Sequence, residues 1–404
     1  MASRILVLDF GGQYNQLIAR RVREQHVFAE VVSYRNTDVE SIKTAGWDGI
    51  IFTGGPSSVY DETSPHFDPA VLDLGIPILG ICYGHQLMAY MAGGEICSAE
   101  SISEYGKVEL EVLDGAHAGT EPSLFKGIPA ASTVWMSHTD YVKTVPSGFA
   151  VTGSTDSCPC AVMECPEKKL YGVQFHPEVT HTEYGTRMLR KFIFDVCRCS
   201  ADWRMDDFLK SSVEGMKEKI GDGRVLLALS GGVDSSVCAA LLAEAVGKNL
   251  TCVFVDHGMM RKNEADEVEA AFSKWDIDFM RIDAGSRFLS ALKGVKDPEE
   301  KRKIIGKEFI KVFEEAGNKI GSVDFLAQGT IYPDIIESGL GDAAVIKSHH
   351  NVGALPEHVD FKEIIEPLRM LFKDEVRALG RELGLPETLV SRQPFPGPGL
   401  AIRI

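Results

Sequence analysis

Residues 76–91 read IPILGICYGHQLMAYM, and this stretch sets the expected class of fold for the first half of the chain. A short apolar run, Ile76–Leu79, is followed by a glycine–cysteine–glycine turn and by the apolar stretch Gln86–Met91. The run is short enough for a buried strand, and the stretch after the turn predicts a helix. A strand that turns directly into a helix is typical of an α/β layer with a mostly parallel sheet.

The sequence on either side of this stretch repeats the same alternation. Lys107–Val112 has period-two alternation and predicts a more antiparallel strand, Leu170–Phe175 predicts another strand, and Thr182–Cys197 a polar helix. Three earlier apolar runs alternate with helical stretches and predict parallel strands: Ile5–Leu8, Val27–Val32 and Gly49–Phe52.

A second α/β pattern begins after residue 200. Met205–Ile220 predicts a charged helix that leads into residues 225–236, VLLALSGGVDSS. A buried strand at Val225–Leu229, a helix at Ser236–Val246 and a strand at Leu250–Val255 complete a β-α-β unit. We therefore predict two doubly wound α/β domains, at residues 1–199 and 200–394, with residues 395–404 beginning a third.

The bulk composition restricts the function. A chain of 404 residues is too long for one ordinary core, and no apolar run approaches the ~18 residues of a membrane helix. A net charge of −16 argues against broad nucleic-acid binding, although it allows a small anion in a local basic pocket. The amino terminus leaves no room for a signal peptide before the first strand, so we expect a cytosolic protein with no membrane partner.

Nine cysteines in such a chain favour free thiols over disulfides. Two close pairs, Cys158/Cys160 and Cys197/Cys199, raise the alternative of a zinc site. Their C-x-C spacing lacks the C-x₂-C and histidine pattern of structural zinc sites, so free thiols are the favoured interpretation.

Cys82 lies in a G-x-C-x-G turn, in the position where many hydrolases carry a nucleophilic serine. Small neighbours allow the tight turn, and the following helix N-terminus favours the reactive thiolate. A buried core cysteine is the plain alternative. His176 and Glu178 lie two residues apart at the end of a predicted strand, where alternation would point both to one face. There Glu178 could orient His176 as the base for Cys82, whereas in isolation a solvated strand end would be the simpler interpretation.

Three segments, Gly54–Pro56, Gly80–Gln86 and Gln174–Glu178, resemble the signature segments of class I glutamine amidotransferases. The resemblance implies hydrolysis of the glutamine amide through a thioester, with Cys82 as nucleophile, His176 as base and Glu178 as its orienting partner. It also implies an oxyanion hole built from the backbone N–H groups of Gly55 and Tyr83. By the same resemblance, glutamine is bound by Gln86, Ser137 and His138.

The turn SGGVDSS, residues 230–236, directs consecutive backbone N–H groups and a helix N-terminus toward one point, which favours phosphate. The lysine of a P-loop is missing, and tight packing is the structural alternative for a glycine-rich turn. The run resembles the N-type ATP pyrophosphatases, which cleave ATP between the α- and β-phosphates. The resemblance places Asp234 beside the pyrophosphate and its Mg²⁺. It implies that ATP is bound by Ser230, Gly231, Gly232, Val233, Asp234, Ser235, Ser236 and Val255.

Four further segments, at 301–306, 327–334, 346–351 and 394–400, resemble the GMP synthetase family, as does the order of the two domains. The resemblance implies that XMP is adenylated at its C2 oxygen and then aminated to GMP. A guanidinium suits a phosphate, so Arg261 is a candidate ligand for XMP. Six candidates for the adenylation site and its lid, each with a surface charge as the alternative, are Asp334, Glu337, Lys347, His349, His350 and Lys373.

The family resemblance further implies a C-terminal dimerisation domain, so we expect a homodimer of the full-length form. Leu400–Ile404 would be the first strand of that domain, and we expect the chain to be truncated there. Two other functions stay open at this point. A different adenylating amidotransferase, serving NAD synthesis or tRNA modification, would share residues 230–236, and a binding protein without turnover would keep the fold alone.

Overall fold

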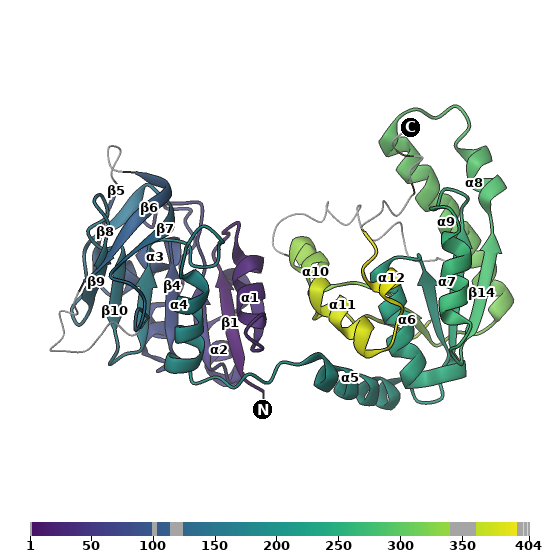
Figure 1. The fold of residues 1–404 in the computed structure, drawn as a ribbon, viewed down its shortest axis with the longest axis horizontal. Helices are drawn as coiled ribbons and strands as arrows, with labels where there is room; N and C mark the ends of the chain where they lie inside the picture. The colour runs from purple at the N-terminus through teal and green to yellow at the C-terminus, as the bar shows by residue number, and fades with distance from the viewer. Residues whose placement is uncertain are drawn as a thin grey trace. The chain divides into compact units, whose positions relative to one another are not determined.

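The computed structural model describes residues 2–98, 103–113, 124–339, 361–393, 399 and 402. The chain divides into two compact units, Met1–Trp203 and Arg204–Ile404, called unit 1 and unit 2 below (Figure 1). Within the described residues, no helix combines the length and the apolar character needed to span a membrane.

Unit 1 is built on a sheet whose described strands have the order β2-β1-β3-β4-β11-β10-β9-β6-β7. The five from β2 to β11 are parallel, and the remaining four pair antiparallel. A separate antiparallel pair joins β5 (Glu95–Ser98) and β8 (Asp140–Thr144). The strands of the large sheet are β1 (Arg4–Asp9), β2 (Phe28–Ser33), β3 (Gly49–Phe52), β4 (Ile78–Ile81), β6 (Glu104–Val112), β7 (Ala131–His138), β9 (Ala150–Ser154), β10 (Val162–Cys165) and β11 (Leu170–Val173).

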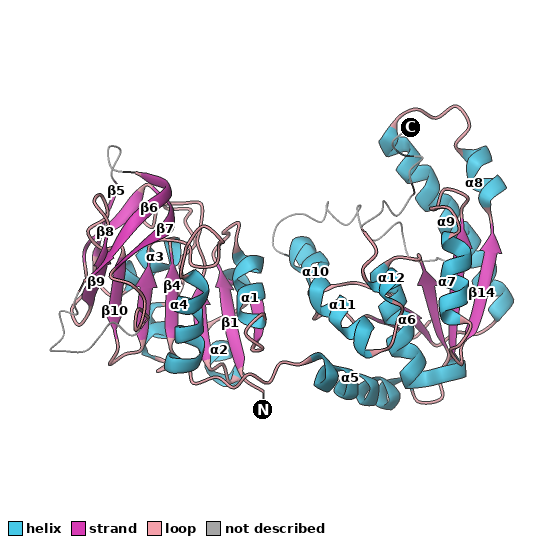
Figure 2. Cartoon of the chain, in the orientation of Figure 1, coloured by secondary structure: helices cyan, strands magenta, loops and turns pink. Residues whose placement is uncertain are grey.

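Helices cover the large sheet from both sides (Figure 2). Every residue of β3 and β4 is buried, as expected for central parallel strands whose two faces are both covered. The helices of unit 1 are α1 (Asn15–Arg23), α2 (Val39–Ala45), α3 (Tyr83–Met91) and α4 (Gly185–Lys191), with 3₁₀ turns at Tyr34–Asn36 and Pro69–Asp73 and a π-helical turn at Phe192–Val196.

Unit 2 is built on a fully parallel sheet with the order β14-β13-β12-β15-β16. Its described strands are β12 (Val225–Leu229), β13 (Leu250–Asp256), β14 (Asp278–Asp283), β15 (Phe325–Ala327) and β16 (Glu363–Ile365). Its described helices are α5 (Met205–Ile220), α6 (Val233–Val246), α7 (Glu264–Phe272), α8 (Gly285–Ala291), α9 (Pro298–Ile320), α10 (Tyr332–Gly339), α11 (Lys373–Glu382) and α12 (Glu387–Val390), with a 3₁₀ turn at Gly247–Asn249.

The strand order of unit 2 indicates where a ligand is expected to bind. From β12 the chain moves outward to β13 and β14 and then returns to the other side of β12 to form β15. Ligands of open parallel sheets bind at such a switch point, outside the carboxyl ends of the strands. The segments that follow β12 and β15 are the SGGVDSS turn and the one that begins at Gln328. The predicted pair of doubly wound α/β layers is confirmed.

Several predicted boundaries were wrong, each for a local reason. The strand expected at Ile76–Leu79 is Ile78–Ile81, because Pro77 has no N–H for the ladder. The helix expected from Ser236 begins at Val233, so most of the SGGVDSS turn is its first turn. The helix expected at Thr182–Cys197 begins at Gly185, and it is amphipathic rather than polar, since Met188, Leu189, Phe192 and Ile193 are buried.

Residues 394–398, 400, 401, 403 and 404 lie outside the described residues, and with them most of the breaker cluster and of the strand predicted at Leu400–Ile404. Ile402 is described. It is buried in the core of unit 2 and does not lie in a strand.

Candidate active sites

Cys82 occupies a strained turn between β4 and α3. Its φ of 53° and ψ of −108° are unusual for a residue with a side chain, and its N–H donates to the carbonyl of Val173 at 2.8 Å. Glycine is required on both sides. A Cβ at Gly84 would lie 2.6 Å from Phe52, and one at Gly80 would lie 2.5 Å from the Gly84 carbonyl. The turn places the thiol at the N-terminus of α3, the position that a nucleophile occupies in a strand-to-helix elbow.

His176 and Glu178 form a buried pair beside this thiol. Nδ1 of His176 lies 2.7 Å from Oε1 of Glu178, and the two residues are 6% and 1% exposed. The backbone around them is fixed, because the His176 N–H donates to the Trp135 carbonyl and the Arg21 guanidinium donates to the Glu178 carbonyl. The carboxylate therefore holds the ring in one orientation, with Nε2 left for Cys82.

The predicted reason for this pairing was wrong. Strand β11 ends at Val173, so His176 and Glu178 lie in the turns that follow it and strand alternation does not align them. Pro177 lies between them and cannot continue a central strand. The pair forms through the tertiary contacts just described.

The protonation of His176 follows from competing effects. Burial by itself would lower the pKa of the imidazole, but the charge of Glu178 and hydrogen bonds to Cys82 and Glu178 together raise it to about 11. His176 is therefore an imidazolium at neutral pH, paired with Glu178 on one side. On the other side it can stabilise the Cys82 thiolate.

The Gly-Gly-Pro loop after β3 lies against the nucleophile. A Cβ on Gly54 would be 3.5 Å from Cε1 of His176 and 3.8 Å from Cβ of Cys82. A Cβ on Gly55 would lie 2.9 Å from the ring of Tyr83. The structure thus places Gly55 directly against Tyr83, and these two residues are the expected oxyanion donors.

Two of the residues expected to bind glutamine, Gln86 and Ser137, lie close to Cys82 through hydrogen bonds. Gln86 is buried, and its amide donates to the Asp140 carbonyl at 2.6 Å and to Oε1 of Gln174 at 3.1 Å. Gln174 in turn donates to the Cys82 sulfur at 3.8 Å, a contact that the sequence did not predict. Cys82 Sγ donates to the carbonyl of Ser137 at 3.7 Å.

His138, the third expected glutamine ligand, has both ring nitrogens engaged in the protein interior. They contact the Asp140 carbonyl and the Glu104 carboxylate. Burial is the largest effect on His138 and lowers the pKa of its ring.

In unit 2, the SGGVDSS turn joins β12 to the N-terminus of α6. Gly231 has a φ of 75°, which only glycine adopts without strain. The hydroxyl of Ser235 accepts from the Ser230 N–H and donates to the carbonyl of Gly232, which fixes the turn. The N-terminus of the 14-residue helix α6 provides N–H groups and a positive dipole end for an anion.

Asp234 and Lys373 meet at this turn. Lys373 Nζ lies 2.6 Å from both carboxylate oxygens of Asp234, from the first position of α11. Lys373 is therefore held at the SGGVDSS turn by its ion pair with Asp234. The backbone of the turn also contacts Gly329, where a Cβ would lie 3.1 Å from the Ser235 nitrogen. Val255 is buried in the neighbouring strand β13.

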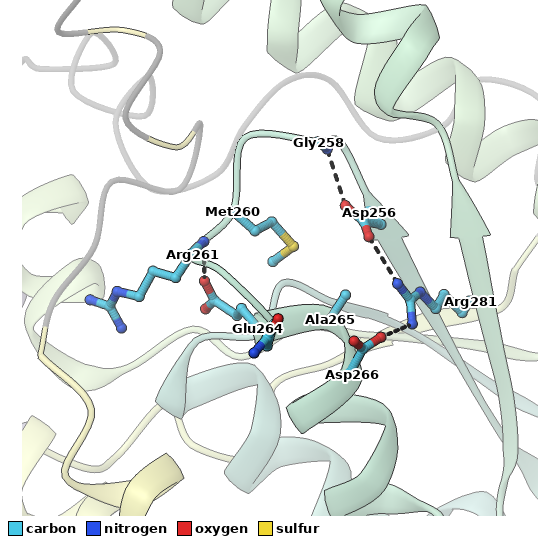
Figure 3. Close-up of a pocket in the computed structure, with 9 residues that line it drawn as sticks. Asp256, Gly258, Met260, Arg261, Glu264, Ala265, Asp266 and Arg281 are labelled. Carbon is cyan, nitrogen blue, oxygen red and sulfur yellow. Dashed lines mark hydrogen bonds and ion pairs between the residues drawn. The ribbon is translucent and has the colours of Figure 1, made fainter.

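A pocket opens at the carboxyl end of β13, next to the start of α7 (Figure 3). Arg281 lines this pocket and forms ion pairs with Asp256 at 3.1 Å and Asp266 at 2.7 Å. Arg261 also lines the pocket, but Figure 3 shows its guanidinium extending away from Arg281, and Nη2 donates to the Gln393 carbonyl at 2.8 Å. Arg261 is thus tied to the backbone of Gln393.

Arg392 is a positioning residue that the sequence did not reveal. Its side chain is 10% exposed and donates to the carbonyl of Gly231 at 3.0 Å and to the buried carboxylate of Glu264 at 2.8 Å. It therefore ties the SGGVDSS turn to the start of α7. No local pattern marks it, because its partners lie more than a hundred residues away.

The other adenylation candidates are only partly described. Asp334 lies in the first turn of α10, where its carboxylate accepts from the Ile331 N–H at 3.3 Å. Glu337 lies in α10, but its side chain is outside the described residues, as are Lys347, His349 and His350 entirely.

Each of the two units contains a segment that matches the model of a known family. Residues 6–196 match the family model described as glutamine amidotransferase class-I, and residues 223–291 match the one described as tRNA methyl transferase HUP domain. A protein of Clostridium botulinum (strain Alaska E43 / Type E3) called GMP synthase [glutamine-hydrolyzing] is 61% identical over 403 residues, covering 99% of this chain and 77% of its own length. A protein of Acetivibrio thermocellus with the same name is 61% identical over 401 residues with the same coverage, and one of Agathobacter rectalis is 59% identical over 405. Similarity of this degree over nearly the whole chain shows that the chain belongs to the glutamine-hydrolysing GMP synthase family.

Proposed function

We propose that this chain makes GMP from XMP, using ATP to activate the base and glutamine as the source of nitrogen. One observation carries the proposal: both site segments lie on a chain that aligns over 99% of its length with proteins called GMP synthase [glutamine-hydrolyzing]. The alternative adenylating amidotransferases share the SGGVDSS turn, but the match to these relatives extends far beyond it.

Unit 1 releases ammonia in this mechanism. The Cys82 thiolate attacks the amide carbon of glutamine, and the N–H groups of Gly55 and Tyr83 stabilise the oxyanion. His176 gives its proton to the departing ammonia, which leaves a thioester. His176 then takes a proton from water as the water attacks, and glutamate is released. The short contact with Glu178 and the raised pKa of His176 support the imidazolium–thiolate starting state.

Unit 2 activates XMP. The turn at 230–236 and the N-terminus of α6 hold the phosphates of ATP. The C2 oxygen of XMP attacks the α-phosphorus and pyrophosphate leaves, so that AMP becomes the group that ammonia displaces. Arg261 and Asp334 stand as proposed contacts for XMP and the adenylation step, together with Glu337, Lys347, His349 and His350.

The residues at the turn fit a Mg²⁺–pyrophosphate group, because Asp234 offers a carboxylate, the kind of ligand Mg²⁺ prefers, at the phosphate end of α6. When bound, Mg²⁺ would neutralise charge on the departing pyrophosphate. Lys373 already contacts both oxygens of Asp234. When Mg²⁺ is bound, the Lys373 ammonium would either keep one of these oxygens while Mg²⁺ takes the other, or bind a phosphate oxygen of ATP instead.

The other proposed properties rest on the family and the composition. We infer a cytosolic location from free thiols, since all nine cysteines are unpaired in the structure. A homodimer and the lack of a nucleic-acid partner stay predictions. Light scattering after gel filtration and a DNA-binding titration would test them.

The test of the function is GMP formation from XMP and MgATP, with either glutamine or ammonium chloride as the nitrogen source. We expect wild type to use both and Cys82→Ala to use ammonium only, because the substitution removes the nucleophile and leaves unit 2 untouched. Cys97→Ala, a partly exposed thiol away from the Cys82 turn, is the matched control and should behave as wild type.

Two outcomes would contradict the proposal. If Cys82→Ala still made GMP from glutamine, the assigned nucleophile would be wrong. If wild type hydrolysed glutamine but made no GMP from either nitrogen source, XMP would be the wrong acceptor for this chain.

A further inference from the structure

Three potential metal ligands converge in the interior of unit 1. Glu104 at the start of β6, His138 at the end of β7 and Cys158 after β9 place a carboxylate oxygen, a ring nitrogen and a sulfur within 4.8 Å of one another. All three are buried, with exposures of 7%, 5% and 0%. The cluster contains none of Cys82, His176 and Glu178, and it shares only His138 with the residues expected to bind glutamine. Its ligands are 20 or more residues apart in the sequence, so no short motif marks it.

The geometry around His138 requires a positive group beside Nε2. Nδ1 lies 3.0 Å from the Asp140 carbonyl, which can only accept, so Nδ1 carries a hydrogen. In the neutral ring this leaves the Nε2 lone pair 3.3 Å from Oε2 of Glu104, which is also an acceptor. Two acceptors this close in a buried site need a cation or a shared proton between them.

The supporting contacts resemble those that orient metal ligands. A metal-bound histidine commonly donates its other ring N–H to a backbone carbonyl, as Nδ1 of His138 does here. The second oxygen of Glu104 accepts from the Thr155 hydroxyl at 2.7 Å, and that hydroxyl accepts from the Cys158 N–H at 2.9 Å. Glu104 and Cys158 are thus held in one network, which fixes the positions of two of the three ligands.

An unsatisfied acid provides a second, independent sign of a cation. Oδ2 of Asp140 is buried without a hydrogen-bond partner, and the residue is only 8% exposed. Its carboxylate acts electrostatically on His138. Two carboxylates in a buried neighbourhood are costly unless positive charge compensates them.

We propose that Glu104, His138 and Cys158 bind one Zn²⁺ ion. A sulfur, an imidazole nitrogen and a carboxylate oxygen form a ligand set that zinc accepts with tetrahedral geometry, with water completing the site. The ion would replace the thiol proton of Cys158. The thiolate and Glu104 would then supply two negative charges against the two positive charges of the metal.

The site is connected to the glutamine pocket. The Asp140 carbonyl accepts from both His138 and Gln86, and Gln86 contacts Gln174, which reaches Cys82. Ser137, whose carbonyl accepts from Cys82, directly precedes His138. A metal at the cluster would therefore stabilise the wall behind the nucleophile, which is a structural role independent of the proposed reaction.

Metal binding is best measured in the full chain carrying Cys82→Ala, so that the catalytic thiol cannot bind the probe. After chelator treatment, the protein is titrated with Zn²⁺ followed by elemental analysis, and with Co²⁺ followed by absorption spectroscopy. We expect one Zn²⁺ per chain and a sulfur-to-cobalt charge-transfer band. Cys158→Ser should abolish the band and weaken Zn²⁺ binding at least tenfold, and Glu104→Gln should weaken binding while keeping the band.

The matched control is Cys160→Ser, a buried thiol two residues away that is not among the three ligands. It should keep both the stoichiometry and the band. The proposal would be overturned if the parent protein did not bind Zn²⁺. It would also be overturned if Cys158→Ser still bound one Zn²⁺ per chain and still showed the cobalt–sulfur band. Circular dichroism of each variant verifies folding, and Glu104→Gln, which preserves side-chain volume, provides a second test if Cys158→Ser does not fold.

Discussion

At the scale of single residues, Glu178 determines how His176 works. Burial lowers the pKa of His176, but the charge of Glu178 and hydrogen bonds to Cys82 and Glu178 together raise it from an ordinary 6.5 to about 11. Protonated His176 therefore stabilises the fold fully below pH 6.5, and this contribution is lost as the pH rises through about 11. In Glu178→Gln the charge of the carboxylate is lost while burial remains, so the pKa of His176 falls and less imidazolium is present at neutral pH. We expect glutaminase kcat to fall by about 10²–10⁴ and Cys82 alkylation by iodoacetamide, followed by mass spectrometry, to slow near pH 7.

Glu183→Gln is the matched control, because Glu183 is an exposed carboxylate only five residues further along. Its substitution should leave both rates unchanged. If Glu178→Gln were alkylated as fast as wild type across the pH range, the carboxylate would not control the protonation of His176.

At the scale of the element, the SGGVDSS turn depends on one backbone conformation. Gly231 has a φ of 75°, and a Cβ there would lie 3.3 Å from side-chain atoms of both Met260 and Phe254. Left-handed backbone costs a residue with a side chain about 1–2 kcal/mol, and here that cost falls on the phosphate-binding turn. Gly231→Ala should raise the KM for ATP in ammonium-dependent GMP synthesis by roughly 5- to 30-fold, the same energy expressed as a ratio. Glutaminase activity should not change.

Gly247→Ala tests whether the effect is local. Gly247 lies at the other end of the same helix α6, also with a positive φ, of 51°. Its substitution should reduce stability to a similar extent in thermal unfolding without changing the KM for ATP. Equal changes in KM for the two variants would mean that loss of stability, and not the shape of the turn, explains the result.

At the scale of the whole molecule, each unit has a hydrophobic core of its own. One buried cluster runs from Leu6 to Leu170 and another from Leu226 to Ile402. We therefore expect two calorimetric transitions. ATP with Mg²⁺ at ~100 times its Kd should stabilise unit 2 by about 2.7 kcal/mol and raise its transition by on the order of 5–10 °C. The transition of unit 1 should stay in place.

Core substitutions assign the transitions. Leu8→Ala should lower only the transition of unit 1 and Val253→Ala only that of unit 2, because each removes fully buried methyl groups from one core. A single transition, or equal shifts of both with MgATP, would contradict independent units.

Much of this protein could be predicted from local sequence. The apolar runs at 49–52 and 225–229 are strands as predicted, since their periodicity and the turns that bound them depend on near neighbours. The turns that carry Cys82 and Gly231 were also visible, because a tight strand-to-helix turn needs glycine at fixed offsets. Sites whose residues are close together in the sequence can be predicted in the same way.

Contacts between distant segments were decided only by the tertiary structure. The sequence did not reveal that Lys373 pairs with Asp234, that Arg392 joins Gly231 to Glu264, or that Gln174 reaches Cys82. The meeting of Glu104, His138 and Cys158 is of the same kind, although the C-x-C spacing argued against a metal there. Strand order and sheet twist place these segments side by side, and both depend on the packing of the whole core. The residues that meet in this way therefore show no periodic pattern in the sequence.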